Sequence, residues 1–258
     1  MSQALLRASG IDVRFGGVHA LRDVAVSVRP GEVCGLIGPN GAGKTTLFDV
    51  LSGMRRPDAG SISYDGTDIT RRSPVWRARH GIRRTFQRQQ LFGQLTVTDN
   101  LVVAQDWRGG ARPAARLRRA RAAAVLHECG LDPLAGTYAG ALPVGRARMV
   151  ELARALADPP RVLLLDEPAS GTTAQERREL AAVIRHMADE EGCAVLLVEH
   201  NVAFVMELCS RVVVLDLGRV LAEGTAAEVQ ADPAVREAYL GTGPDPGGAT
   251  TELPDAGA

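Results

Sequence analysis

The stretch from 38 to 46, GPNGAGKTT, has the residue types of a loop that cradles phosphate groups. It fits the pattern G-x-x-x-x-G-K-[ST], in which glycines let the backbone approach a ligand and direct N–H groups toward it. Lys44 is the only lysine of the chain, and every other basic residue is an arginine. A compact ammonium fits between two phosphate oxygens, whereas a planar guanidinium is bulkier. The predicted nucleotide-binding residues of this loop are Gly38, Pro39, Asn40, Gly41, Ala42, Gly43, Lys44, Thr45 and Thr46.

Two carboxylates follow an apolar run at 162–165, within RVLLLDEPASG. Such a continuous run is typical of a parallel strand that is buried on both faces. We expect Asp166 to hold Mg²⁺, directly or through water, with the hydroxyl of Thr45 on the same ion. Glu167 is then placed to act as the general base toward an attacking water.

Both groups of residues need elements that position them. Residues 32–38 (EVCGLIG) have the pattern of a buried strand, and residues 44–54 (KTTLFDVLSGM) have that of a helix. The N-terminus of this helix would add the positive end of its dipole to the phosphate site. The residues expected on its buried face are Leu47, Val50, Leu51 and Met54.

The remaining chain predicts an α/β fold with two kinds of sheet. Residues 4–30 alternate between apolar and polar positions and predict an antiparallel β layer. Residues 31–86 and 158–225 alternate strand and helix patterns, which predicts a mainly parallel sheet. Between these halves, residues from about 88 to 157 are rich in Ala and Arg and predict a helical subdomain.

The C-terminal part adds a hairpin and a tail. Residues 211–224 predict a hairpin that turns near Gly218. Residues 242–258 are rich in Gly, Pro and small residues, so we expect this tail to be disordered.

Composition excludes several classes of protein. The 258 residues include 45% hydrophobic residues and carry no net charge, which indicates one large domain or a core with a small subdomain. The four cysteines show no zinc-ligand or disulfide spacing and fit a reducing compartment. No stretch has the roughly 20 apolar residues that cross a bilayer, and no signal peptide is expected.

From about 4 to 241, the order of these motifs resembles the ATP-binding subunits of ABC transporters. The resemblance implies a P-loop NTPase fold that binds and hydrolyses ATP with Mg²⁺. It also implies that Phe15 stacks on adenine and that Gln87, in RTFQ, senses Mg²⁺ and the γ-phosphate at the transmembrane-domain contact. His200, after the LLVE strand, is implied as the switch histidine that reaches the γ-phosphate.

The family's LSGGQ signature is altered to LPVGR at 142–146. Pro143 replaces the serine, and a proline in the first turn of a helix is favourable because its missing N–H would be unpaired there. We expect the helix to direct the N–H groups of Val144 and Gly145 at the ATP of a partner subunit. Further along, Thr173 stands where many members have Asp. The buried stripe of this helix is predicted to be Met149, Leu152, Ala153 and Leu156.

Segments 81–105, 198–229 and 232–241 are similar to the branch that takes up branched-chain, hydrophobic amino acids. Two alternatives stay open: an ABC transport ATPase for another solute, such as urea uptake or lipopolysaccharide export, and a soluble ABC protein that acts on ribosomes or DNA. The single ATPase core and short insert favour transport.

The resemblance also implies partners. In the family, two ATPase subunits enclose two ATP molecules, and the altered signature at Pro143 favours a paralogue over a second copy of this chain. Permease subunits would hold the chain at the cytoplasmic face of the cell membrane, with a solute-binding protein as an indirect partner. The arginine clusters at 71–88 and 108–124 are either solvated faces or face the anionic inner leaflet. Nucleic acid is not expected, because the net charge is zero and aromatic residues make up only 4%.

Overall fold

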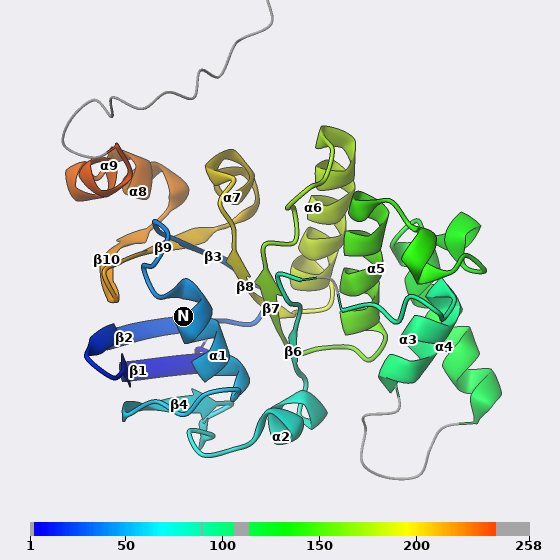
Figure 1. Cartoon of the computed structure of the whole chain (residues 1–258), viewed down its shortest axis with the longest axis horizontal. Helices are drawn as coiled ribbons and strands as arrows, with labels where there is room; N and C mark the ends of the chain where they lie inside the picture. The colour runs from blue at the N-terminus through cyan, green and yellow to red at the C-terminus, as the bar shows by residue number, and fades with distance from the viewer. Residues whose placement is uncertain (1–2, 89, 106–113, 241–258) are drawn as a thin grey trace, which may run out of the picture.

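A computed structural model describes residues 3–88, 90–105 and 114–240 as an α/β fold built on two sheets (Figure 1). The first sheet is antiparallel, with the strand order β2-β1-β4-β5. Its strands are β1 (Leu6–Phe15), β2 (Val18–Val28), β4 (Ala59–Tyr64) and β5 (Thr67–Asp68). The predicted antiparallel β layer at the N-terminal end is confirmed.

The prediction for 31–86 was partly wrong, because β4 and β5 join the antiparallel sheet. Asp65 and Gly66, both with positive φ of 50° and 75°, form the two-residue turn between these strands. An Asp-Gly pair in this conformation is a strong hairpin signal. β4 then pairs with β1, with Leu6 opposite Tyr64.

The second sheet is mainly parallel and has the strand order β10-β9-β3-β8-β7-β6. Its strands are β3 (Val33–Ile37), β6 (Ile82–Arg84), β7 (Val162–Asp166), β8 (Ala194–Val198), β9 (Arg211–Asp216) and β10 (Arg219–Gly224). Only β10 runs antiparallel to its neighbour, in the predicted hairpin with β9 that turns at Gly218. The predicted strands at 32–38 and 162–165 are confirmed.

Alternate side chains of this parallel sheet enter two separate cores. In β7, Val162 and Leu164 pack with the antiparallel sheet, whereas Leu163 and Leu165 pack against helices on the other face. Every residue of β3, β7 and β8 is buried. Burial on both faces explains why these strands are apolar without alternation.

The helices cover the parallel sheet on both sides. α1 (Lys44–Ser52) packs between the two sheets, and α6 (Ala174–Asp189) and α7 (Val202–Leu208) pack on the opposite face. The remaining helices are α2 (Pro74–Arg79), α3 (Val97–Ala104), α4 (Ala115–Glu128), α5 (Val144–Leu156), α8 (Ala226–Ala231) and α9 (Pro233–Leu240).

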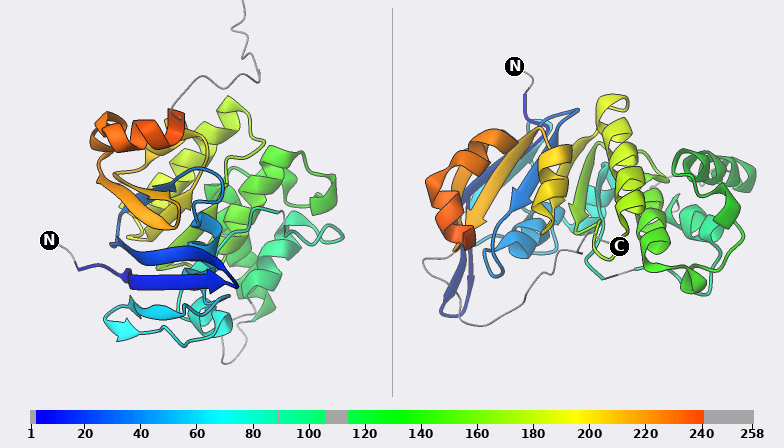
Figure 2. Two further views of the ribbon diagram at one scale, coloured as in Figure 1. Left: turned by 60° about the vertical axis from the view of Figure 1, so that its left-hand side comes forward. Right: turned by 90° about the horizontal axis from the view of Figure 1, so that it is seen from above.

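Helices α3, α4 and α5 fall within the predicted subdomain at 88–157, and α3 and α4 gather at the end away from the antiparallel sheet (Figures 1 and 2). The boundaries of that subdomain and of the domain at 4–241 stay predictions. The tail at 242–258 lies outside the described residues. Among the described residues, no helix is both long enough and apolar enough to span a membrane.

The prediction that Met54 continues the buried face of α1 was wrong. α1 ends at Ser52, and Gly53 adopts a left-handed conformation with φ of 79°. Glycine at this position ends helices because it has no Cβ to clash. The chain then turns away, and Met54 is 59% exposed while Leu47, Val50 and Leu51 are buried.

Candidate functional site

The carboxyl ends of β3, β8 and β7 bring the candidate residues together. β8 lies between the other two strands, with Val198 paired to Leu36 on one side and to Asp166 on the other. The loops after these three strands therefore leave the sheet side by side, where α/β proteins bind ligands. The loop after β3 is the phosphate loop, the loop after β7 carries Glu167, and the loop after β8 carries His200.

The phosphate loop needs glycine where it enters α1. Gly43 has φ of 105° and is the N-cap of the helix. A Cβ at this position would lie 2.7 Å from the carbonyl oxygen of Ala20 and 2.8 Å from Leu21 Cδ2. Both the conformation and the close approach exclude larger residues. The loop therefore lies directly against β2.

Lys44 is held by the loop that it belongs to. Its side chain is buried, and Nζ donates hydrogen bonds to the carbonyl oxygens of Gly38 at 2.6 Å and Pro39 at 3.0 Å. Burial lowers the pKa of Lys44, and the nearby carboxylates of Glu167 and Asp166 raise it. The ammonium is thus fixed at the loop, near two acidic groups.

The three predicted catalytic residues meet at one carboxylate. Gln87 Nε2 donates to both carboxylate oxygens of Glu167 at 3.1 Å, and His200 Nε2 lies 2.8 Å from Glu167 Oε1. Glu167 has φ of 49°, a strained value for a residue other than glycine. The strain and the two side-chain contacts fix the position of the carboxylate.

Glu199, which was not among the predicted site residues, holds the two loops that carry Glu167 and His200. Its buried carboxylate accepts the backbone N–H groups of Ala169 at 2.7 Å and of His200 at 3.2 Å. Burial raises the pKa of Glu199, and these N–H groups lower it. An acidic residue directly after an apolar strand was the available signal. Glu199 ties the loop after β7 to the loop after β8.

Asp166, the predicted Mg²⁺ ligand, is buried and paired with an arginine. Its Oδ2 accepts a hydrogen bond from Arg84 Nη2 at 3.2 Å. Burial raises the pKa of Asp166, whereas Arg84 lowers it. Arg84 has no local sequence signal, because its contact with Asp166 links positions 82 apart in the chain.

A cavity of about 580 Å³ joins most of the predicted residues. From the predicted set it is lined by Asn40, Gly41, Ala42, Gly43, Lys44, Thr45, Thr46, Gln87, Glu167 and His200. The structure adds linings that sequence reasoning missed: Gly17, Val18, His19, Ala20, Arg22, Val198, Leu217 and Gly218. Its size and its convergent polar groups suit a nucleotide.

Six predicted site residues do not line that cavity: Phe15, Gly38, Pro39, Asp166 and the signature pair Val144 and Gly145. Phe15 ends β1 with its ring half exposed, and Arg55 covers one face at 3.7 Å. Its predicted stacking on adenine stays a prediction.

Val144 and Gly145 begin α5, away from the cavity. Pro143 is the N-cap of this helix and does not lie within its first turn as predicted, because its ψ of 152° is extended. Gly145 is buried, and a Cβ on it would lie 2.2 Å from the carboxylate of Glu176. The predicted buried stripe of α5 is confirmed at Met149, Leu152, Ala153 and Leu156.

The departure at Thr173 has a structural explanation. Thr173 is the N-cap of α6, and its hydroxyl accepts the N–H of Glu176 while the Glu176 carboxylate accepts the N–H of Thr173. Threonine and aspartate both serve as N-caps. The residue that replaces Asp therefore keeps the start of α6 intact.

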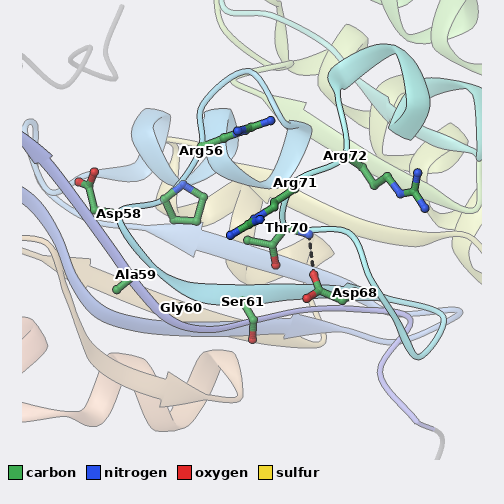
Figure 3. A pocket seen from close by; sticks show the side chains of 10 residues that line it. Arg56, Asp58, Ala59, Gly60, Ser61, Asp68, Thr70, Arg71 and Arg72 are labelled. Carbon is green, nitrogen blue, oxygen red and sulfur yellow. Dashed lines mark hydrogen bonds between the residues drawn. The ribbon is translucent and has the colours of Figure 1, made fainter.

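Two further depressions lie elsewhere on the described surface. A groove of about 510 Å³ runs between β6, α2, α3 and α5, and Val75, Phe92 and Arg154 are among its lining residues. A wider depression of about 920 Å³ lies over β4 and the turn after β5, and Arg56, Arg71 and Asp68 are among its lining residues (Figure 3). Neither contains a residue of the phosphate loop.

Three features define a P-loop nucleotide hydrolase: a phosphate loop between a buried strand and a helix, an Asp-Glu pair at the end of β7, and a histidine in the loop after β8. The family model described as "ABC transporter" matches residues 21–170, and one described as "Branched-chain amino acid ATP-binding cassette transporter" matches 219–245. The chain belongs to the ABC transporter family as an ATP-binding subunit, and it binds ATP and hydrolyses it in support of transport.

Individual relatives agree with this assignment. The chain is 38% identical over 253 residues to the high-affinity branched-chain amino acid transport ATP-binding protein BraF of Pseudomonas aeruginosa, covering 93% of this chain and 99% of BraF. It is 36% identical to the lipopolysaccharide export system ATP-binding protein LptB of Escherichia coli, covering 92% of this chain and 98% of LptB.

Among solved structures, the ADP conformation of MJ1267, an ATP-binding cassette of an ABC transporter, superimposes with a TM-score of 0.85 at 30% identity. That superposition covers 93% of this chain and 100% of MJ1267.

Proposed function

We propose that this chain is the ATP-hydrolysing subunit of an importer for branched-chain amino acids. The observation that carries the solute assignment is the match of residues 219–245 to the branched-chain family model. The names of the relatives BraF and LivG, each 38% identical, support it. Lipopolysaccharide export is the second candidate, because LptB is nearly as similar at 36% identity.

Glu167 acts as the general base in the proposed reaction. Its carboxylate is placed to take a proton from the water that attacks the γ-phosphate. The contacts with Gln87 and His200 support this role, because they hold the carboxylate at the rim of the cavity that Lys44 also lines. In this proposal the ring of His200 leaves Glu167 to contact an oxygen of the γ-phosphate, and its place in the lining of the same cavity supports that role.

The residues of the phosphate site fit a magnesium ion. Thr45, Gln87 and Asp166 supply a hydroxyl, an amide oxygen and a carboxylate, and Mg²⁺ prefers such oxygen ligands. The described residues contain no group of three or more His, Cys, Asp or Glu that could hold a metal. That agrees with an ion held by few protein groups together with phosphates and water. When bound, Mg²⁺ neutralises charge on the phosphates.

The groove between β6, α2, α3 and α5 is the proposed docking surface for a permease. Phe92, Val75 and Met54 line it and are 51%, 45% and 59% exposed. Arg154 and Glu151 add charge to the same lining. An amphipathic helix docks in grooves of this kind through apolar anchors. The permease would hold this chain at the cytoplasmic face of the membrane.

A second ATPase subunit completes the proposed assembly. Val144 and Gly145 lie outside the cavity of their own chain, which supports a role toward the ATP of a partner. Pro143 offers no hydroxyl there, and losing a hydrogen bond to a charged group costs about 1.5–3 kcal/mol. We therefore propose a paralogue with a serine in its signature as the partner, and two unequal ATP sites.

The test is the ATPase rate of the complex with its permease and binding protein in lipid nanodiscs. We expect leucine, isoleucine and valine to stimulate the rate, and urea or lipopolysaccharide to leave it unchanged. Stimulation by lipopolysaccharide instead would favour the second candidate. The mass of the same complex shows whether it contains one copy of this chain or two. Two copies without a paralogue would contradict the unequal sites.

A further inference from the structure

Arg84, the last residue of β6, joins the helix of the phosphate loop to Asp166. Its Nη1 donates to Asp49 Oδ1 at 2.6 Å and to Ser52 Oγ at 3.0 Å, both on α1. Its Nη2 donates to Asp166 Oδ2 at 3.2 Å. The side chains of Arg84 and Asp166 are only 7% and 5% exposed, so water contributes little to this contact.

The surroundings fix the guanidinium in place. The ring centres of Phe48 and Phe86 lie 5.7 Å and 5.0 Å from its central carbon. The next residue, Thr85, accepts the backbone N–H of Asp166 with its hydroxyl at 3.1 Å. Two consecutive residues at the end of β6 thus hold both the main chain and the side chain of Asp166.

The pairing leaves one carboxylate oxygen of Asp166 available. Oδ2 is engaged by Arg84, whereas none of the hydrogen bonds within the described residues reaches Oδ1. A buried oxygen without a hydrogen-bond partner would belong to the buried unpaired polar atoms of the described residues, and Oδ1 is not one of them. Oδ1 is therefore accessible from outside the protein. A guanidinium can hold one oxygen of a carboxylate in a fixed direction because its donors form a rigid fork. Arg84 therefore determines where Oδ1 points.

We propose that Arg84 is a positioning residue for Mg²⁺–nucleotide binding. It orients Asp166 so that Oδ1 receives the ion or its water, and Asp49 balances the rest of its charge. This inference rests on the proposed Mg²⁺ site. Residues that orient a metal ligand typically change metal affinity about 10- to 100-fold when they are replaced.

The experiment measures binding of a fluorescent ATP analogue to the full chain while Mg²⁺ is titrated, with EDTA as the zero point. Arg84→Met keeps the bulk of the side chain and removes the contacts with Asp166 and Asp49. We expect the Mg²⁺ concentration that gives half of the maximal change in nucleotide binding to rise about ten-fold or more. Affinity without Mg²⁺ should stay within about two-fold of the wild-type value, because Lys44 and the loop N–H groups are unchanged.

Arg83→Met is the matched control. Arg83 lies on the same strand, is 12% exposed, and pairs with Asp158 at 2.5 Å. Its substitution also removes a nearly buried ion pair, but not one with Asp166. Its Mg²⁺ titration should superimpose on that of the wild type. Arg84→Lys keeps the charge without the fork, and it should shift the titration in the same direction by a smaller factor.

Several results would overturn the inference. One is a titration of Arg84→Met or Arg84→Lys that is identical to that of the wild type. The others are an equal shift of the titration in Arg83→Met, or a half-maximal Mg²⁺ concentration that is lower in Arg84→Met than in the wild type. If Arg84→Met does not fold, Arg84→Lys alone decides between these results. If the nucleotide affinity of the wild-type chain does not change with Mg²⁺ concentration, the proposed Mg²⁺ site itself is contradicted.

Discussion

Glu167 illustrates how single residues are prepared for chemistry in this chain. Its backbone is strained at φ of 49°, and its carboxylate touches Gln87 and His200. A base that is already oriented needs little rearrangement when the reaction begins. The two neighbours come from the loops after β6 and β8, so two separate strands of the sheet position the carboxylate of the proposed base.

Replacing Glu167 by Gln should separate binding from hydrolysis. The amide keeps the size of the side chain but cannot take a proton, so we expect turnover to fall about 10²- to 10⁴-fold. Nucleotide affinity should be nearly unchanged. Steady-state phosphate release and analogue binding by the same preparation measure both quantities, and wild-type turnover in Glu167→Gln would show that another group is the base.

Lys44→Arg should lose activity even though it keeps the charge. Nζ of Lys44 is buried within 3.0 Å of two loop carbonyls, so the larger guanidinium has no room in the same place. We expect ATP affinity to fall at least about ten-fold, the loss expected when a charged hydrogen bond is removed. Lys44→Ala is the comparison. Wild-type affinity and turnover in Lys44→Arg would rule out the steric explanation.

At the scale of elements, the start of α5 depends on the start of α6. Gly145 lies under the carboxylate of Glu176, which also caps α6 through Thr173. A side chain at Gly145 therefore disturbs the cap of a second helix. The glycine of the altered signature therefore has a structural reason within this single chain, apart from any contact with ATP.

Gly145→Ala should destabilise the chain by about 1–3 kcal/mol, because the new methyl group overlaps the Glu176 carboxylate. In a Glu176→Ala background the same substitution should cost much less. Urea unfolding of the four variants gives the coupling free energy between the two positions. Equal costs in both backgrounds would show that the overlap is relieved elsewhere.

Sequence patterns predicted the elements that depend on local signals. The phosphate loop, the buried strands and the hairpin at Gly218 each follow from neighbouring residues. Met54 was misplaced because periodicity alone does not show that Gly53 ends the helix. β4 was assigned to the wrong sheet because its partner, β1, is far away in the sequence.

The residues that hold the site in place were predictable from the sequence only in part. Asp166 and Glu167 stand in a recognisable motif, but Arg84 and Glu199 act through contacts with distant residues. A buried arginine in a short strand has no local pattern that separates it from a solvated one. Its role requires the sheet order β8-β7-β6, which places it beside Asp166.

For the whole molecule, we proposed that a permease docks in the groove between β6, α2, α3 and α5. Phe92→Asp places a charge among the exposed apolar groups of the groove, so we expect the permease to be lost during co-purification. Nucleotide binding by the isolated chain should remain. Leu117→Asp is the control, since Leu117 is 47% exposed on α4 and outside that lining. Equal losses in both variants would argue against docking in the groove.

The proposed function requires the site around Lys44 and Glu167 to power uptake of branched-chain amino acids. The most direct measurement is the ATP-dependent movement of labelled leucine in proteoliposomes that contain the permease, the binding protein and this chain with its partner ATPase. We expect leucine to be transported with wild-type chain and transport to stop with Glu167→Gln. Undiminished leucine transport with Glu167→Gln, or no leucine transport by a complex that hydrolyses ATP, would contradict the account.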